Sequence, residues 1–264
     1  MRILVAITEV ATPDDTIEFS DKSIIESNFT YGLNEWDEYA IEEAIQISES
    51  DSDSDSDVIS VTIAPPRAEK TIRMALAKGV TKAIRVWDPK LELLPFLDPQ
   101  LKAKIIAKVV SIVSPDIILT GVQSSNDCWG STGVALAAEV GFNWATLVTD
   151  LELSGDVAHV RRELENGIDE LAEVTLPAVF TIQTGINEPR YASLRGIKQA
   201  QQKELEVLSF SDLSSDPDEF QSKINFIEFS LPISNSAIQF FEGNPNEQAA
   251  QIATIIKDLG FGGG

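Results

Sequence analysis

Residues 58–121 read VISVTIAPPRAEKTIRMALAKGVTKAIRVWDPKLELLPFLDPQLKAKIIAKVVSIVSPDIILTG, and strand and helix patterns alternate along them. Runs typical of buried strands cover residues 58–63, 83–87 and 116–121, and apolar residues at helical spacing cover 69–78 and 101–114. Alternation at such short intervals is typical of a parallel sheet with helices on both faces. The stretch therefore predicts an α/β fold with a doubly wound, mostly parallel sheet.

The region before this stretch continues the pattern. Arg2–Ile7 is a continuous apolar strand of the kind that is buried on both faces of a parallel sheet. Residues 14–32 predict an exposed excursion, and a helix follows at 34–47 with an apolar stripe of Trp36, Ala40, Ile41, Ala44 and Ile47. Asn34 is a competent N-cap and is also placed to reach a ligand, but capping alone is enough to explain it. Residues 48–57 form an acidic loop of serine and aspartate, which predicts a solvated insertion.

A polar loop with several glycines follows the last strand of the quoted stretch. It reads GVQSSNDCWGSTG over residues 121–133 and opens a helix at 134–140. Free backbone N–H groups at a helix start suit a phosphate, and ligands of such sheets bind at the carboxyl ends of the strands. The loop matches neither the P-loop nor the Rossmann glycine pattern. Two interpretations stay open, a nucleotide-binding loop and a plain turn in which Thr132 is the N-cap.

The next segments predict an antiparallel extension of the sheet and a possible docking element. Strand patterns at residues 147–153, 157–164 and 171–173 are separated by turns. Residues 176–207 begin with an apolar strand, pass through a loop that holds Tyr191 and Leu194, and end in a short polar helix at 197–205. An isolated leucine on an exposed loop suggests a docking surface, and an ordinary strand–loop–helix connection is the alternative.

After Val207 the pattern weakens. Residues 209–222 are acidic and predict a loop, residues 224–231 predict one strand, and residues 248–259 predict a final amphipathic helix. We therefore expect an α/β domain at residues 1–207 and a C-terminal arm at 208–264.

Composition excludes several classes of function. The formal net charge of −22 argues against a nucleic-acid partner, because phosphate backbones bind to basic faces. Cys128 and His159 are single residues of their kind, so the sequence predicts no intrachain disulfide, no structural zinc site and no triad that contains histidine. The first apolar run is too short for a membrane span, which favours a cytoplasmic location. Such acidity also suggests a salt-loaded cytoplasm and a haloarchaeal origin; a merely acidic bacterial protein is the alternative.

Three motifs resemble the β subunit of electron-transfer flavoprotein. They are LPAV with the later NEPRY-x-x-L-x-x-I at residues 176–197, TIRMALAKGV at 71–80, and the loop at 121–133. The resemblance implies a sheet of the adenine-nucleotide-binding type and an arm, 208–264, that packs on an α subunit. It implies an electron carrier rather than an enzyme, with no catalytic residue. Electrons would pass from dehydrogenases, such as acyl-CoA dehydrogenases, toward a quinone reductase. The FAD would be held mainly by the α subunit, with this chain covering one side of it and binding AMP.

The same resemblance implies roles for individual residues. The segment at 183–206 would recognise the partner dehydrogenase, with Leu194 inserting into a pocket and Tyr191 beside it. Arg162 and Glu163 would contact the flavin domain of the α subunit, and Pro13 and Trp36 would lie near FAD. The implied AMP contacts are Ala6, Asn34, Ile63, Gln123, Asp127, Gly130, Ser131 and Thr132.

Two rival functions remain open from the sequence. One is a bifurcating flavoprotein subunit that holds its own second FAD in the nucleotide cleft. The other is a stand-alone nucleotide-binding α/β protein, although the chain lacks the S-G-G-x-D-S phosphate loop of ATP pyrophosphatases with a similar fold.

Overall fold

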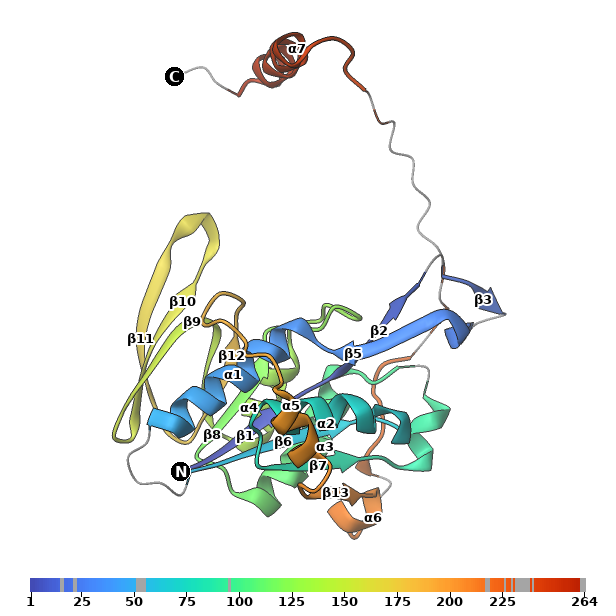
Figure 1. Cartoon of the computed structure of the whole chain (residues 1–264), viewed down its shortest axis with the longest axis vertical. Coiled ribbons are helices and arrows are strands. Elements are labelled where there is room, and N and C mark those ends of the chain that lie inside the picture. The colour runs from blue at the N-terminus through green and yellow to red at the C-terminus, as the bar shows by residue number, and fades with distance from the viewer. Residues whose placement is uncertain are drawn as a thin grey trace. The chain divides into compact units, whose positions relative to one another are not determined.

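The computed structural model describes residues 1–14, 17–20, 23–50, 56–94, 96–216, 219–225, 227–228, 230, 238 and 240–261. The chain divides into two compact units, Met1–Glu228 and Phe229–Gly264. Among the described residues, the first unit contains the main sheet and the second contains the helix α7 (Figure 1).

Within the described residues, nine strands form one sheet in the order β11-β10-β9-β12-β8-β1-β6-β7-β13. The seven strands from β9 to β13 in this order pair in parallel, and β10 and β11 continue the sheet in antiparallel register. The prediction of a doubly wound, mostly parallel sheet with an antiparallel extension is confirmed. The strands are β1 (Arg2–Ala6), β6 (Asp57–Ile63), β7 (Lys82–Val86), β8 (Ile117–Gly121), β9 (Asn143–Ser154), β10 (Val157–Glu163), β11 (Asp169–Thr175), β12 (Ala178–Ile182) and β13 (Leu205–Leu208).

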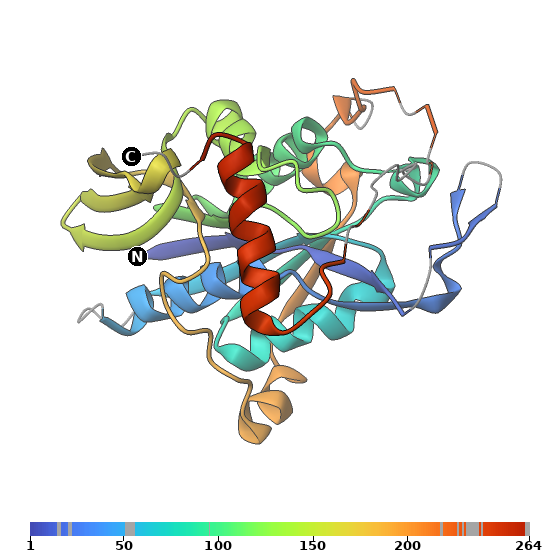
Figure 2. The same cartoon turned by 90° about the horizontal axis from the view of Figure 1, so that it is seen from above.

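Helices cover both faces of the sheet (Figure 2). α1 (Glu35–Ser50) and α2 (Glu69–Lys78) lie on one face, and α3 (Pro99–Val113) and α4 (Thr132–Val140) lie on the other. Successive side chains of a strand point to opposite faces, so the fully buried Ile3 and Leu4 of β1 belong to different apolar cores. This explains why the central strands are mostly apolar on both faces and lack the alternation of a one-sided sheet. Short 3₁₀ turns occur at Glu26–Asn28, Pro66–Ala68, Pro89–Leu93 and Glu165–Gly167.

An antiparallel ribbon extends from the end of β1. β2 (Glu9–Pro13) pairs with β5 (Phe29–Leu33), and the short strands β3 (Phe19–Ser20) and β4 (Ser23–Ile24) pair beyond them. Residues 14–32 were expected as an exposed excursion without this pairing. The ribbon has few apolar positions to pack on the sheet, which is why its strand pattern is weak in the sequence.

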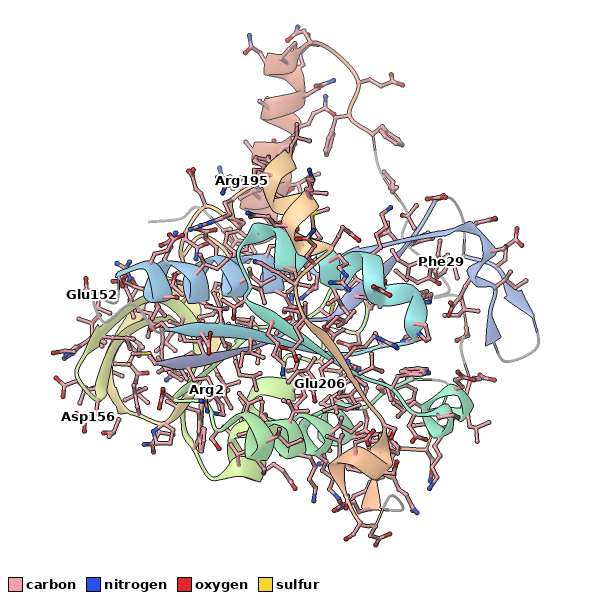
Figure 3. All side chains as sticks on the ribbon, turned by 60° about the horizontal axis from the view of Figure 1, so that its bottom comes forward. Arg2, Phe29, Glu152, Asp156, Arg195 and Glu206 are labelled. Carbon is pink, nitrogen blue, oxygen red and sulfur yellow. The ribbon has the colours of Figure 1, made fainter. Side chains whose placement is uncertain are left out.

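The segment after β12 differs from the expected helix at 197–205. α5 spans Leu194–Ala200, because the Ser193 hydroxyl accepts a hydrogen bond from the Gly196 N–H at 3.0 Å and caps an earlier helix start. β13 then begins at Leu205 and pairs with β7 at the edge of the sheet. The expected helix was therefore wrong at both ends. Its end was missed because the long-range pairing of β13 with β7 is not visible in the local sequence. Figure 3 labels Arg195 on α5 and Glu206 on β13.

Residues beyond Val207 also belong to the first unit. The ring centroids of Phe210, at the start of α6 (Phe210–Leu213), and Phe220 lie 4.4 Å apart, and both rings are buried in the core on the α3 side. The first compact unit runs from Met1 to Glu228.

The remaining C-terminal predictions have mixed outcomes. None of the described residues among 224–231 is in a strand; Phe226, Phe229 and Leu231 lie outside the described residues. In the second unit α7 spans Pro245–Asp258, and Asn244 and Glu247 form a capping box at its start. Of the acidic loop at 48–57, residues 51–55 lie outside the described residues. No helix in the described parts of the chain has both the length and the apolar character needed to cross a bilayer.

Candidate functional site: a pocket where the strand order reverses

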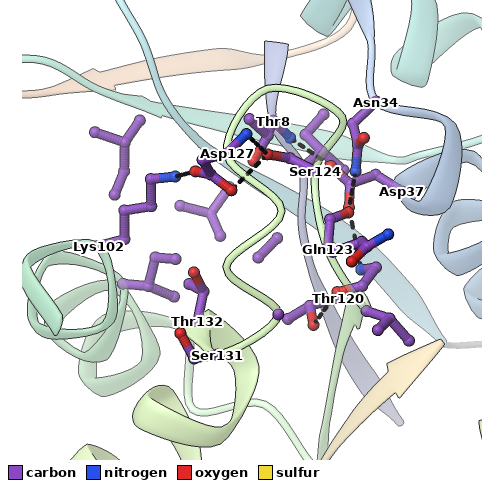
Figure 4. A pocket seen from close by; sticks show the side chains of 18 residues that line it. Thr8, Asn34, Asp37, Lys102, Thr120, Gln123, Ser124, Asp127, Ser131 and Thr132 are labelled. Atoms are coloured by element: carbon purple, nitrogen blue, oxygen red, sulfur yellow. Dashed lines mark hydrogen bonds and ion pairs between the residues drawn. The ribbon is translucent and has the colours of Figure 1, made fainter. Parts of the chain in front are cut away.

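A pocket lies at the carboxyl ends of β1, β6 and β8 (Figure 4). From β1 the chain moves outward through β6 and β7, then returns to place β8 on the other side of β1. Such a reversal leaves a crevice between the loops that follow the two strands, and ligands of open α/β sheets bind there. The unfilled space is about 640 Å³, counting the part that opens to solvent.

The structure brings together all eight residues that the resemblance implied as AMP contacts. Two of them end strands and one precedes α1, whereas the other five belong to the loop at 121–133, so segments far apart in sequence converge. These lining residues are Ala6, Asn34, Ile63, Gln123, Asp127, Gly130, Ser131 and Thr132.

Asn34 positions the pocket loop. Its Nδ2 donates to the Gln123 carbonyl at 2.8 Å, and its Oδ1 accepts from the Ser125 N–H at 3.3 Å. α1 begins instead through the Asn34 backbone carbonyl, which accepts from the Glu38 N–H at 3.2 Å. The side-chain cap expected from the sequence is therefore replaced by two bonds that fix the loop above the sheet.

The loop ends where α4 begins. Ser131 rather than Thr132 occupies the N-cap position, and Thr132 is the first helical residue. The first N–H groups of an α-helix have no partner within the helix, so they are available to a ligand in the pocket. At Gly133 an added Cβ would lie 2.5 Å from Thr181 Cγ2, which explains why glycine is needed for α4 to approach β12 so closely.

Lys102 is a lining residue that sequence reasoning missed. Its Nζ lies 2.7 Å from Asp127 Oδ2, and Asp127 Oδ1 accepts from the Ser124 hydroxyl at 2.9 Å. Burial acts to raise the pKa of Asp127, but Lys102 and these hydrogen bonds outweigh it and hold the pKa below its ordinary value. A lysine in a helix suggests a solvated face, and only the packing of α3 turns it toward the pocket.

Asp37 is a second lining residue that the sequence did not reveal. Its buried carboxylate accepts from the Thr8 N–H at 2.7 Å and from the Gly121 N–H at 3.0 Å. Burial raises the pKa of Asp37 to about 7 in spite of these bonds. A Cβ at Gly121 would lie 2.5 Å from Asp37 Oδ1, so only glycine fits there. Asp37 thus ties the ends of β1 and β8 to the first turn of α1.

Comparison with known proteins assigns the chain to a family. A sequence profile of the electron transfer flavoprotein domain matches residues 22–213. The chain is 40% identical to the electron transfer flavoprotein subunit beta of Methylophilus methylotrophus, with 98% of this chain and 99% of that protein aligned. It belongs to the electron transfer flavoprotein β-subunit family. The subunits of the same name from Bacillus subtilis and Homo sapiens are 31% and 30% identical, and each alignment covers 98% of the relative.

In this member of the electron transfer flavoprotein family, the two residues implied for docking are almost fully exposed. Tyr191 is 97% exposed and Leu194, the first residue of α5, is 89% exposed. They lie outside the pocket, on the segment between β12 and β13. Exposed apolar side chains of this size on an ordered segment are candidates for burial by a partner.

The residues implied to lie near the flavin of an electron transfer flavoprotein also lie outside the pocket. Trp36, in the first turn of α1, donates from Nε1 to Gln183 Oε1 at 3.2 Å, and Gln183 Nε2 donates to Glu163 Oε2 at 3.2 Å. Arg162 donates from Nε to the Thr146 carbonyl at 2.9 Å and forms an ion pair with Glu170. Trp36 and Glu163 are therefore joined through Gln183, whereas Pro13 is at the end of β2, paired with Phe29.

Proposed function

We propose that this chain is the β subunit of a heterodimeric electron carrier. The observation that supports this most strongly is its similarity, over nearly the full length, to proteins named electron transfer flavoprotein subunit beta. The α subunit would hold most of the FAD. Dehydrogenases, of which acyl-CoA dehydrogenases are the proposed class, would deliver electrons, and a quinone reductase would receive them. As a carrier subunit, the chain needs no residue that makes or breaks a bond.

The pocket suits a nucleoside monophosphate. Ala6 and Ile63 give apolar contacts for a base, and the start of α4 with Lys102 gives donors for a phosphate. Backbone N–H groups and a lysine are a common donor set for a dianionic phosphate. AMP is the nucleotide that we assign to this pocket.

The chain would cover one side of the FAD through its exposed face near Trp36 and Pro13. Bound FAD would supply the electron storage, which no amino-acid side chain of this chain provides. The indole of Trp36 is oriented by its bond to Gln183, and Glu163 at the end of the same set of bonds faces the solvent. We infer that this set orients the face that the α subunit's flavin domain contacts, together with Arg162.

The C-terminal arm would pack on the α subunit. No residue of α7 is buried in the chain by itself, although the isoleucines of this helix repeat at helical spacing. An amphipathic helix with an uncovered apolar stripe is stabilised by a partner surface.

The decisive experiment is extraction of the nucleotides from the purified heterodimer, with mass measurement and quantification. We expect one FAD and one AMP per heterodimer. Two FAD molecules per heterodimer would instead support the bifurcating rival. A chain that remains a soluble monomer, binds ATP and does not associate with an α subunit would support the stand-alone rival.

The charge of −22 further suggests that the protein works in a cytoplasm of high salt, as in haloarchaea. Like charges repel one another over about 10 Å at 0.1 M salt and over about 3 Å at 1 M salt. Dissolved salt would therefore stabilise this chain more than it stabilises a neutral protein.

A further inference from the structure

Arg190, which precedes the exposed Tyr191, is fixed to α1 by five hydrogen bonds. Its Nε and Nη2 donate to the two oxygens of Glu42 at 2.8 and 3.0 Å, and its backbone N–H donates to Glu42 Oε2 at 3.1 Å. Nη1 and Nη2 also donate to Glu49 at 2.7 and 3.0 Å. Paired contacts between a guanidinium and a carboxylate fix direction as well as distance.

The two carboxylates differ in how strongly they hold Arg190. The side chain of Glu42 is 5% exposed, whereas that of Glu49 is 60% exposed, so water and salt screen the second ion pair far more. Burial acts to raise the pKa of Glu42, but its bonds with Arg190 outweigh burial and lower the pKa. Of the two carboxylates, Glu42 therefore contributes more to holding Arg190 against α1.

Neighbouring contacts fix the backbone on both sides of Arg190. Asn187 Nδ2 donates to Glu43 Oε2 at 2.9 Å and to the Tyr39 carbonyl at 3.1 Å. Lys78 Nζ donates to the Arg190 carbonyl at 3.0 Å, so α2 also holds the segment. These contacts join the segment to α1 and α2, whereas the side chains of Tyr191 and Leu194 are exposed.

The helix that carries Leu194, α5, packs closely on the end of α2. A Cβ at Gly196 would lie 2.4 Å from the Ala77 carbonyl oxygen, so the absence of a side chain lets α5 rest on the end of α2. Lys203 Nζ donates to the carbonyls of Leu76 and Val80 at 2.8 and 2.6 Å. Lys203 thereby joins the end of α2 to the end of the docking segment, residues 183–206.

We propose that Glu42 is a positioning residue for partner docking: by fixing Arg190 on α1, it presents Tyr191 and Leu194 in the bound arrangement before the partner arrives. This inference rests on the proposed docking of a dehydrogenase at Leu194. An ordered segment loses less conformational freedom on binding, so its affinity is higher than that of the same side chains on a mobile loop. Glu42 touches neither the partner nor a cofactor and acts only through the segment.

The first test needs no partner. In the purified heterodimer, Glu42→Gln should increase amide hydrogen exchange of residues 187–197 by tenfold or more and leave the melting temperature near that of the wild type. Glu35→Gln on the same helix is the matched control, because Glu35 makes none of these contacts, and it should change neither quantity. Unchanged exchange in Glu42→Gln would overturn the proposal.

The second test uses electron transfer from an acyl-CoA dehydrogenase reduced by its acyl-CoA substrate. Glu42→Gln should raise KM for the flavoprotein about fivefold or more with kcat unchanged. If Glu42 acts through Tyr191 and Leu194, adding Glu42→Gln to Leu194→Ala should raise KM by a smaller factor than Glu42→Gln does by itself, because the two changes are coupled. Additive effects, or a loss in kcat alone, would contradict the positioning role. If Leu194→Ala by itself leaves transfer unchanged, the docking function fails, and the exchange result still decides whether Glu42 orders the segment.

Discussion

Lys102 Nζ lies 2.7 Å from Asp127 Oδ2, so the lysine that lines the pocket is already paired with a carboxylate on the pocket loop. A phosphate that enters the pocket must share Lys102 with Asp127 or replace it. The pair therefore compensates the charge of a half-buried cation and leaves that cation within reach of an anionic ligand.

Replacing this lysine should weaken nucleotide binding. A hydrogen bond to a charged group contributes roughly 1.5–3 kcal/mol, so Lys102→Met should lower the affinity for AMP by about 10- to 100-fold. Titration calorimetry on the nucleotide-stripped heterodimer measures this change. Lys104→Met, on the same helix but outside the pocket lining, is the control and should bind AMP as the wild type does. If Lys102→Met binds AMP with the same affinity as the Lys104→Met control, Lys102 does not belong to the AMP site.

The protonation of Asp37 should make stability depend on pH. Its pKa is about 7 in the folded chain and near its ordinary value of 3.8 when unfolded, so the folded state keeps a proton that the unfolded state loses between these values. The stability that this group contributes is complete below about pH 4 and is lost as pH rises through about 7, by about 1.4 kcal/mol per pH unit. Urea unfolding of the wild type and Asp37→Asn measures it. The free energy of unfolding of the wild type should fall relative to the variant across this window, and a constant difference would refute the assignment.

Truncation of the docking leucine should impair electron transfer and spare the fold. Full burial of a leucine is worth about 1.5–3 kcal/mol, so Leu194→Ala should reduce transfer from a dehydrogenase by about tenfold or more, mainly through docking. Leu93→Ala is a matched control, since Leu93 is 83% exposed elsewhere on the surface. Stopped-flow reduction of the flavin compares the two. If Leu194→Ala melts early while transfer per folded molecule stays normal, the leucine has a structural role instead.

Salt should stabilise the chain. Acidic residues outnumber basic ones by 42 to 20, and screening of their repulsion increases from about 0.1 M to about 2 M KCl. We expect the melting temperature to rise by several degrees over this range, given that 1 kcal/mol corresponds to about 2–4 °C in a domain of this size. Differential scanning calorimetry at several KCl concentrations gives the answer. A melting temperature that is flat or falls with KCl would count against adaptation to high salt.

The C-terminal unit should be protected only in the heterodimer. Ile252, Ile255 and Ile256 of α7 are exposed in the chain by itself, and a partner that buries them stabilises the folded arm. Limited proteolysis should cut the isolated chain within residues 229–261 much faster than it cuts the heterodimer. Equal rates of cleavage would show that the arm does not pack on the α subunit.

The sequence predicted the sheet well because its central strands are apolar on both faces, a pattern that needs no knowledge of neighbours. It also offered the loop at 121–133 as a ligand-binding loop, with a plain turn as the alternative, and the structure places this loop in the pocket at the carboxyl ends of β1, β6 and β8. It did not reveal Lys102 or Asp37, because a charged residue in a helical pattern is normally solvated and only tertiary packing turns it inward. The strand at Leu205–Leu208 was missed for a related reason, namely that its partner β7 is far away in sequence.

One helix, α1, contributes residues to both proposed functions, nucleotide binding and partner docking. Asn34 and Asp37 at its start shape the nucleotide pocket, while Glu42 and Glu49 in its later turns hold the docking segment. A graft that moves only residues 183–206 into another scaffold would therefore leave the anchoring carboxylates behind and carry over the side chains without their geometry. To exchange partner preference between two such proteins, α1 and the docking segment should have to be transplanted together.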